Sequence, residues 1–276
     1  MSGELGAVLF DMDGTLVDTE GLWWQACVEV AAELDLKLTE ADAGNVLGRL
    51  VEDAAEYLAR RAPVPPGAER AGAAEAEAER AGVAKIEAGA ERAEVTGTEV
   101  EAERAEMTEM EAGAVRAKVT GIEVERVGAR LTEAFAERVS RGVTPLPGAI
   151  RLLDDLAAEG VPTALVSASP RLIVDMVLHT VGAERFALVV AAEDTARGKP
   201  LPDPYLLAAS GLGLDPAACV AVEDSPTGLA AARAAGCRVV SVSGDPVAED
   251  VLSVDSLEKV DLPLLRLLAS GRRSIG

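Results

Sequence analysis

Short apolar runs and segments with helical periodicity alternate along most of this chain. The first run, "LGAVLFD" at residues 5–11, ends in an acid, which is typical of a buried parallel strand with a functional group at its C-terminal end. Similar apolar runs follow at residues 162–169, 186–194, 218–225 and 237–244. Helix-period segments lie beside them at residues 148–160, 170–182, 202–213 and 227–236. This alternation predicts an α/β fold with a Rossmann-like, doubly wound parallel sheet.

The alternation breaks between the first and second predicted strands. Helical spacing, and no convincing strand, occurs there at residues 22–36, 50–62 and 129–142. We therefore predict an α/β core made of residues 1–17 and 143–276. An α-helical cap, residues 18–142, would be inserted after the first strand.

One tract of the predicted cap, residues 67–130, has a composition of its own. Alanine, glutamate, glycine and arginine dominate, and leucine, proline and aromatic residues are absent. The stretch "EAGAERAEVTG" at 87–97 recurs as "EAGAVRAKVTG" at 111–121, so the tract contains a duplication. Eight glycines and no sustained apolar stripe leave little to pack. We expect a poorly packed, partly helical or disordered insertion rather than a solenoid or a partner-binding helix.

Composition excludes several classes of partner. The net charge is −21, from 47 acids and 26 bases, whereas a nucleic acid or an anionic membrane needs a basic face. Cys27, Cys219 and Cys237 lie in apolar segments and form no CxxC pair, which indicates reduced thiols. The N-terminus shows no basic start followed by a long apolar run, and no stretch of 18 uncharged apolar residues occurs. We expect a cytoplasmic protein, with a monomer as the default.

Polar side chains stand at the ends of the predicted strands. Asp11 and Asp13 follow the first strand, and Gly14 allows a sharp turn directly after them. The later strand ends carry Ser167 and Ser169, then Lys199, then Glu223 and Asp224. Because the C-terminal ends of parallel strands meet at one edge, four acids and a lysine would surround one pocket. This set fits a Mg²⁺ site with room for a phosphate.

The ordered motifs "DMDGT", "VSAS", "GKP" and "VEDSPTG" resemble those of the haloacid dehalogenase superfamily. The helical insertion is similar to the first cap type of that superfamily. Within it, the chain resembles the branch of β-phosphoglucomutase and the sugar-phosphate phosphatases. The resemblance implies that Asp11 is a nucleophile that forms an aspartyl-phosphate, and that Asp13 is the general acid and base.

The resemblance also implies a ligand set for metal and phosphate. Mg²⁺ would be held by the Asp11 carboxylate, the backbone carbonyl of Asp13, and Asp224, with Glu223 binding directly or through water. The transferring phosphoryl group would be bound by Ser167, Lys199 and Thr15. The second acid, Asp13, disfavours carbon–halogen cleavage, because dehalogenases of this superfamily lack it.

The stretch "DTEGLW" is similar to "DSEPLW" of hexose- and hexitol-phosphate phosphatases. Trp23 stands where β-phosphoglucomutase-like mutases carry a histidine. The resemblance therefore implies a magnesium-dependent phosphatase of a small phosphorylated metabolite, a sugar or polyol phosphate. Two alternatives remain: a phosphomutase, and a non-catalytic protein whose Glu/Ala-rich tract recruits a partner.

Several cap-side residues have two interpretations. Trp23 either lines the pocket or packs in a helix core, where we expect Trp24. Arg49, in "LGRLVED", contacts a substrate hydroxyl or a second phosphate, or is an exposed arginine. Glu20 is a pocket acid or a charge at a helix N-terminus. Ser169 completes the candidate substrate contacts.

Overall fold

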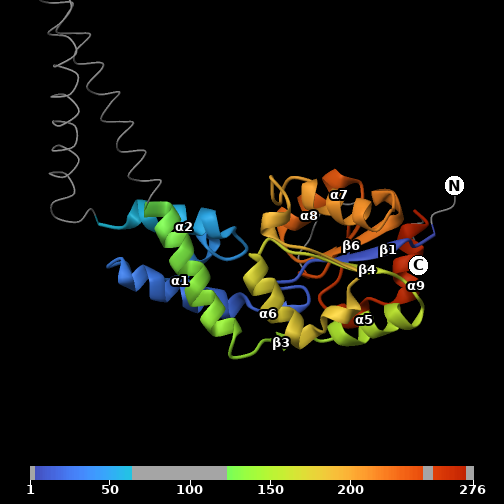
Figure 1. The fold of residues 1–276 in the computed structure, drawn as a ribbon, viewed down its shortest axis with the longest axis horizontal. Helices are drawn as coiled ribbons and strands as arrows, with labels where there is room; N and C mark the ends of the chain where they lie inside the picture. The colour runs from blue at the N-terminus through green and yellow to red at the C-terminus, as the bar shows by residue number, and fades with distance from the viewer. Residues whose placement is uncertain (1–3, 64–122, 245–250, 272–276) are drawn as a thin grey trace, which may run out of the picture.

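The computed structural model describes residues 4–63, 123–244 and 251–271. Figure 1 shows an α/β core at one end of the molecule and a group of helices at the other. The elements of the core come from both sides of the helical segment in the sequence. This arrangement follows the predicted insertion of helices after the first strand.

The core contains a six-stranded parallel sheet in the described part of the chain, in the order β5-β4-β1-β6-β7-β8. Its strands are β1 (Ala7–Phe10), β4 (Thr163–Val166), β5 (Leu188–Val190), β6 (Cys219–Glu223), β7 (Arg238–Ser241) and β8 (Leu252–Ser253). The predicted α/β class and the five predicted strands are confirmed. The two-residue strand β8 was not predicted, because so short a pairing leaves no periodic signal.

The pairing register of the strands determines which residues meet at the C-terminal edge of the sheet. Phe10, the last residue of β1, pairs with Leu165 of β4 and Val222 of β6. The residue after each of these positions therefore lies near the same edge of the sheet, at the C-terminal ends of the strands. Asp11 and Glu223 are brought together in this way.

Helices cover both faces of the sheet. The core helices are α5 (Ala149–Ala158), α6 (Arg171–Val181), α7 (Asp203–Gly211), α8 (Pro226–Ala235) and α9 (Leu262–Ala269). Alternate residues of β1 enter two different buried clusters: Val8 and Phe10 pack with α5, α6 and α9, whereas Ala7 and Leu9 pack with α7 and α8. Figure 1 shows α7 and α8 above the sheet and α5 and α6 below it. The predicted double winding is confirmed.

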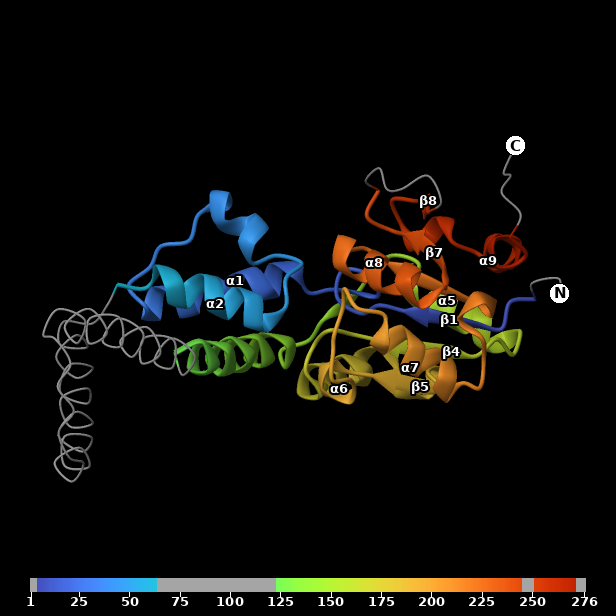
Figure 2. The ribbon, with the colours of Figure 1, turned by 90° about the horizontal axis from the view of Figure 1, so that it is seen from above.

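The cap contains α1 (Glu20–Glu33), a 3₁₀ segment (Glu40–Asn45), α2 (Val51–Arg61) and a helix over residues 123–139. The two chain passages between cap and core lie side by side, because β2 (Val17–Asp18) pairs antiparallel with β3 (Thr144–Pro145). Figure 2 shows α1, α2 and the helix at 123–139 grouped together, apart from the sheet.

The helix at 123–139 overlaps the tract that we predict to be poorly packed. Residues 123–130 were assigned to the poorly packed tract, but Val127 and Leu131, one turn apart, are 2% and 0% exposed. Their spacing makes one face of this helix apolar and buries it in the cap. The rest of the tract, and with it the partner-recruiting hypothesis, lies outside the described residues.

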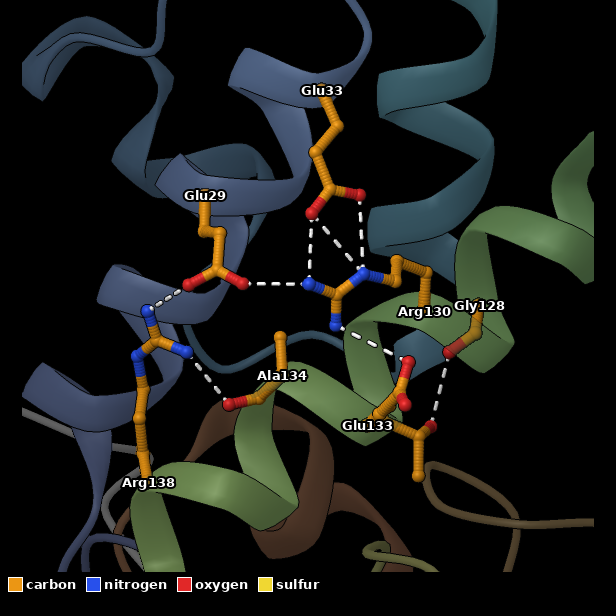
Figure 3. Close-up of polar contacts among 8 residues, drawn as sticks. Glu29, Glu33, Gly128, Arg130, Glu133, Ala134 and Arg138 are labelled. Carbon is orange, nitrogen blue, oxygen red and sulfur yellow. Dashed lines mark hydrogen bonds and ion pairs between the residues drawn. The ribbon is translucent and has the colours of Figure 1, made fainter.

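Ion pairs join this helix to α1 (Figure 3). The Arg130 guanidinium lies 2.7 Å from the Glu29 carboxylate and 2.8 Å from that of Glu33. Arg138 contacts the other oxygen of Glu29 at 2.6 Å. Hydrogen bonding by Arg138 is the main cause that lowers the pKa of Glu29. Glu29 is therefore the shared anchor of both arginines.

No described helix is long and apolar enough to cross a membrane. Cys27, Cys219 and Cys237 are buried and unpaired. Burial raises the pKa of Cys27 and Cys237 to about 12 and is the main cause that raises that of Cys219 to about 11, so these thiols are poor nucleophiles.

We predict that Glu29→Gln destabilises the protein by about 1 kcal/mol, because both arginines lose their common anion. Thermal or urea unfolding measures the change. Glu56→Gln is the matched control, since it breaks a single exposed pair with Arg60 on α2 and should cost at most about 0.5 kcal/mol. The difference should shrink in about 1 M NaCl, where surface charges are screened. Equal effects of the two variants would contradict a network centred on Glu29.

Candidate active site

Lys199 lies buried between two carboxylates at the C-terminal edge of the sheet. Its ammonium donates to Asp11 Oδ1 at 2.6 Å, to Glu223 Oε1 at 2.6 Å and to the Val166 carbonyl at 2.8 Å. Lys199 is 3% exposed and Glu223 is 0% exposed. Burial alone would lower the pKa of this lysine, but the charges of Asp11 and Glu223 outweigh burial and raise it. The lysine is therefore held as a fixed cation.

Three acids gather around this cation. Asp11, Glu223 and Asp224 each offer a carboxylate oxygen, and these oxygens lie within 4.8 Å of one another. Burial, followed by the charge of Asp11, raises the pKa of Asp224 to about 8 and that of Glu223 to about 7. One ammonium cannot offset three carboxylates, and a hard divalent cation with oxygen ligands would relieve the remaining repulsion. The donor set therefore fits Mg²⁺.

Gly14 makes room for this cluster. Its φ of +79° lies in the left-handed region that glycine adopts freely. A β-carbon at this position would lie 2.1 Å from Oδ2 of Asp224. The turn after the two aspartates therefore requires glycine, both for its backbone angle and for the approach of Asp224.

Glu223 is enclosed on all sides by its neighbours. Its Oε1 accepts the Lys199 ammonium and also the Tyr205 hydroxyl, which lies 2.5 Å away. Its Oε2 accepts the Ser225 hydroxyl at 3.3 Å. A β-carbon on Gly228 of α8 would lie 1.9 Å from this carboxylate. Sequence reasoning missed Tyr205, because nothing in the stretch around it indicates which face of α7 meets β6.

Asp13 is clamped by two hydroxyl groups. Thr19 donates to its Oδ1 and Ser169 to its Oδ2, both at 2.7 Å. Burial, together with the charge of Asp11, raises the pKa of Asp13 in spite of these hydrogen bonds. Thr19 stands at the N-cap position of α1 and was also missed; its only signal was a hydroxyl residue before a helix, which ordinarily predicts a cap. Ser169, predicted to contact substrate, here contacts Asp13.

The other two predicted phosphate ligands lie beside the same cluster. Ser167 is 2% exposed, and its Oγ accepts the backbone N–H of Ser169 at 3.0 Å. Thr15 is fully buried and donates to Asp224 Oδ1 over 3.4 Å. Thr15 therefore contacts the acidic cluster, and Ser167 directly follows Val166, whose carbonyl accepts the Lys199 ammonium.

Trp23 lies in the core of the cap. It is 8% exposed, its indole N–H donates to the Val46 carbonyl at 2.7 Å, and its ring packs edge-on against Phe135 at 5.3 Å between centroids. These contacts correspond to the helix-core interpretation. Trp24, which we expected in the core, is only partly buried.

The structure leaves two cap-side predictions at the surface. Glu20 is exposed at the first position of α1. Arg49 is also exposed, and its Nε donates to the Gly44 carbonyl at 3.3 Å. Arg49 lines a cavity of about 240 Å³ together with residues of the 3₁₀ segment and α2, all from the cap. The acids around Lys199 do not line this cavity, so substrate contact by Glu20 and Arg49 stays a prediction.

Comparisons with known proteins agree with this architecture. A family model of haloacid dehalogenase-like hydrolases matches residues 5–236. Hexitol phosphatase A of Escherichia coli (strain K12) is 40% identical over 125 residues, which make up 44% of this chain and 58% of that protein. The chain thus spans little more than half the length of this curated relative.

Solved structures share the fold. A mutant of CbbY from Rhodobacter sphaeroides, in complex with xylulose-(1,5)bisphosphate, is similar with a TM-score of 0.67 at 21% identity, over 95% of this chain and all of that one. A β-phosphoglucomutase from Clostridium difficile has a TM-score of 0.66 at 18% identity, over 97% and 98% of the two chains. At these identities the likeness concerns the fold alone.

We predict that Gly228→Ala destabilises the protein by about 2 kcal/mol, although alanine favours a helix, because its β-carbon must displace the Glu223 carboxylate. Gly21→Ala in α1 is the control, since nothing lies within 4 Å of the added atom. It should stabilise the protein by about 0.5–1 kcal/mol. Thermal unfolding distinguishes the two, and a neutral Gly228→Ala would contradict the enclosure of Glu223.

Proposed function

The chain belongs to the haloacid dehalogenase-like hydrolase family, and we propose that it is a magnesium-dependent phosphatase of a small phosphorylated metabolite, a sugar or polyol phosphate. The observation that carries this proposal is the cluster of the buried Asp11, Lys199 and Glu223 with the half-buried Asp224, and Asp13 beside it. A hexitol phosphatase among the similar proteins supports the substrate class.

In the first step, Asp11 would attack phosphorus. Lys199 holds its Oδ1, so Oδ2 is the oxygen that forms the new bond. The bond from phosphorus to the ester oxygen breaks, and that oxygen takes a proton from Asp13. The raised pKa of Asp13, caused mainly by burial, favours the protonated form that this step needs. The products are an alcohol and an aspartyl-phosphate on Asp11.

In the second step, Asp13 would act as a base. Its carboxylate takes a proton from a water molecule that attacks phosphorus, the bond to Asp11 breaks, and inorganic phosphate is released. Lys199 and Ser167 would bind phosphoryl oxygens throughout. Ser167 accepts the Ser169 N–H, which leaves its own proton to donate.

The residues that would hold Mg²⁺ are Asp11 and Asp224, the backbone carbonyl of Asp13, and Glu223 directly or through water. The ion would supply positive charge beside the transferring phosphoryl group. The cap would select the substrate, so we also propose the division into a core of residues 1–17 and 143–276 and a cap of 18–142. The antiparallel pairing of β2 with β3, where the chain leaves and re-enters the core, supports these boundaries. A monomeric, cytoplasmic enzyme completes the proposal.

Hydrolysis is favoured over phosphomutase activity by the contacts of Trp23. Mutases of the similar branch place a histidine at this position, whereas Trp23 has no acid–base group and its N–H is already bonded to Val46. The one histidine of the chain, His179, is exposed in the last turn of α6.

We predict steady phosphate release from at least one member of a panel of hexose, pentose and hexitol phosphates with Mg²⁺. Asp11→Asn should lower the rate by about three orders of magnitude or more, as is usual when a nucleophile is removed. Asp155→Asn, on the outer face of α5, is the control and should leave the rate unchanged. Faster conversion of a hexose 1-phosphate to its 6-phosphate would establish a mutase, and no turnover of any phosphate ester would refute the proposal.

We also predict that Mg²⁺ raises the melting temperature more at about pH 8.5 than at about pH 6.5. The metal-free site retains a proton up to the raised pKa of Asp224, about 8, and Mg²⁺ must displace it. Because a carboxylate with a raised pKa binds its proton more tightly in the folded state, the free energy of unfolding without Mg²⁺ should fall as the pH rises from about 4 to about 8.

Asp224→Asn is the control for this pH dependence. It removes both the titrating proton and a metal ligand, so the stabilisation by Mg²⁺ should be small at both pH values. An Mg²⁺ effect that is independent of pH in the native chain would contradict a site built on Asp224.

A further inference from the structure

Tyr205 lies against the buried ion pair and has no part in the proposed reaction. It is fully buried in the first turn of α7. Its hydroxyl donates to Glu223 Oε1 at 2.5 Å, and the Lys199 ammonium lies 5.2 Å from the centroid of its ring. Tyr205 therefore touches both members of the Lys199–Glu223 pair.

The acceptor capacity of Glu223 shows what this hydroxyl does. A carboxylate oxygen has two lone pairs, and those of Oε1 are taken by Lys199 and Tyr205. Ser225 donates to Oε2, and Gly228 leaves no space for the carboxylate to turn. Without the Tyr205 hydroxyl, Lys199 would be the only donor to Oε1.

Lys199 and Tyr205 compete as hydrogen-bond donors for the same oxygen of Glu223. Lys199 also donates to Asp11, the proposed nucleophile, and must reach the phosphoryl group. A second donor on Oε1 weakens the hold of Glu223 on the ammonium, because the two donors share one oxygen.

We propose that Tyr205 is a positioning residue, which shares Glu223 with Lys199 and thereby leaves the lysine available to Asp11 and to a bound phosphoryl group. This inference rests on the proposed function for the identity of that group. It gives Glu223 a second role, as the anchor of the lysine, in addition to its proposed place beside the metal.

The test is Tyr205→Phe, which removes only the hydroxyl. Inorganic phosphate binding is measured by calorimetry at saturating Mg²⁺, and Mg²⁺ binding is measured alone. The variant should bind phosphate about tenfold more weakly, the scale of a lost hydrogen bond to a charged group, while its Mg²⁺ affinity stays within about threefold. In a Glu223→Gln background, Tyr205→Phe should add less than about a twofold change, because the two residues act as one unit.

Thr163→Val is the matched control. It removes a buried hydroxyl that donates to the Arg185 carbonyl at the opposite, N-terminal end of β4. It should lower the melting temperature and leave both affinities unchanged. Native-like phosphate binding by Tyr205→Phe, or an equal loss in both backgrounds, would overturn the positioning role while leaving the phosphatase proposal intact. If the native protein binds Mg²⁺ but no phosphate, both proposals fail.

Discussion

The burial of one ammonium between two carboxylates is the constraint on which the rest of the site depends. Transfer of Lys199, Asp11 and Glu223 out of water costs several kcal/mol for each ion, and their mutual contacts, with the hydrogen bonds around them, offset that cost. Removal of one partner would leave an uncompensated buried charge, at a cost of about 3–5 kcal/mol. The three residues come from distant parts of the chain, so the sheet and the loop before α7 must form together for the charges to be paired.

Hydroxyl groups and glycines hold the carboxylates of the site in place. Tyr205 and Ser225 complete the acceptor sites of Glu223, and Thr19 and Ser169 do the same for Asp13. Thr19 belongs to the start of the cap helix α1, whereas Ser169 belongs to the loop after β4. The orientation of Asp13, the proposed general acid, is thus tied to the cap and the core at once.

The sequence predicted the sheet and the strand-end acids because both follow from local patterns: apolar runs of strand length, each ending in a polar group. The role of Tyr205 could not be predicted in this way, because its partner Glu223 lies 18 residues away and only tertiary packing brings α7 against it. The helical conformation of residues 123–128 was missed for another reason. Its Val127–Leu131 stripe is short, and the surrounding alanine, glutamate and glycine hid it.

The charge of the site determines which ligands it can bind and in which order. When ionised, the three acids around Lys199 leave two negative charges uncompensated, which one divalent cation would neutralise. Without that cation a phosphate dianion meets carboxylates in a low-dielectric pocket, and the whole chain, at −21, repels it as well. The same field attracts Mg²⁺. We therefore expect the metal to bind first, and a phosphate ester to bind only the metal-loaded site, where Lys199 adds a second, fixed positive charge.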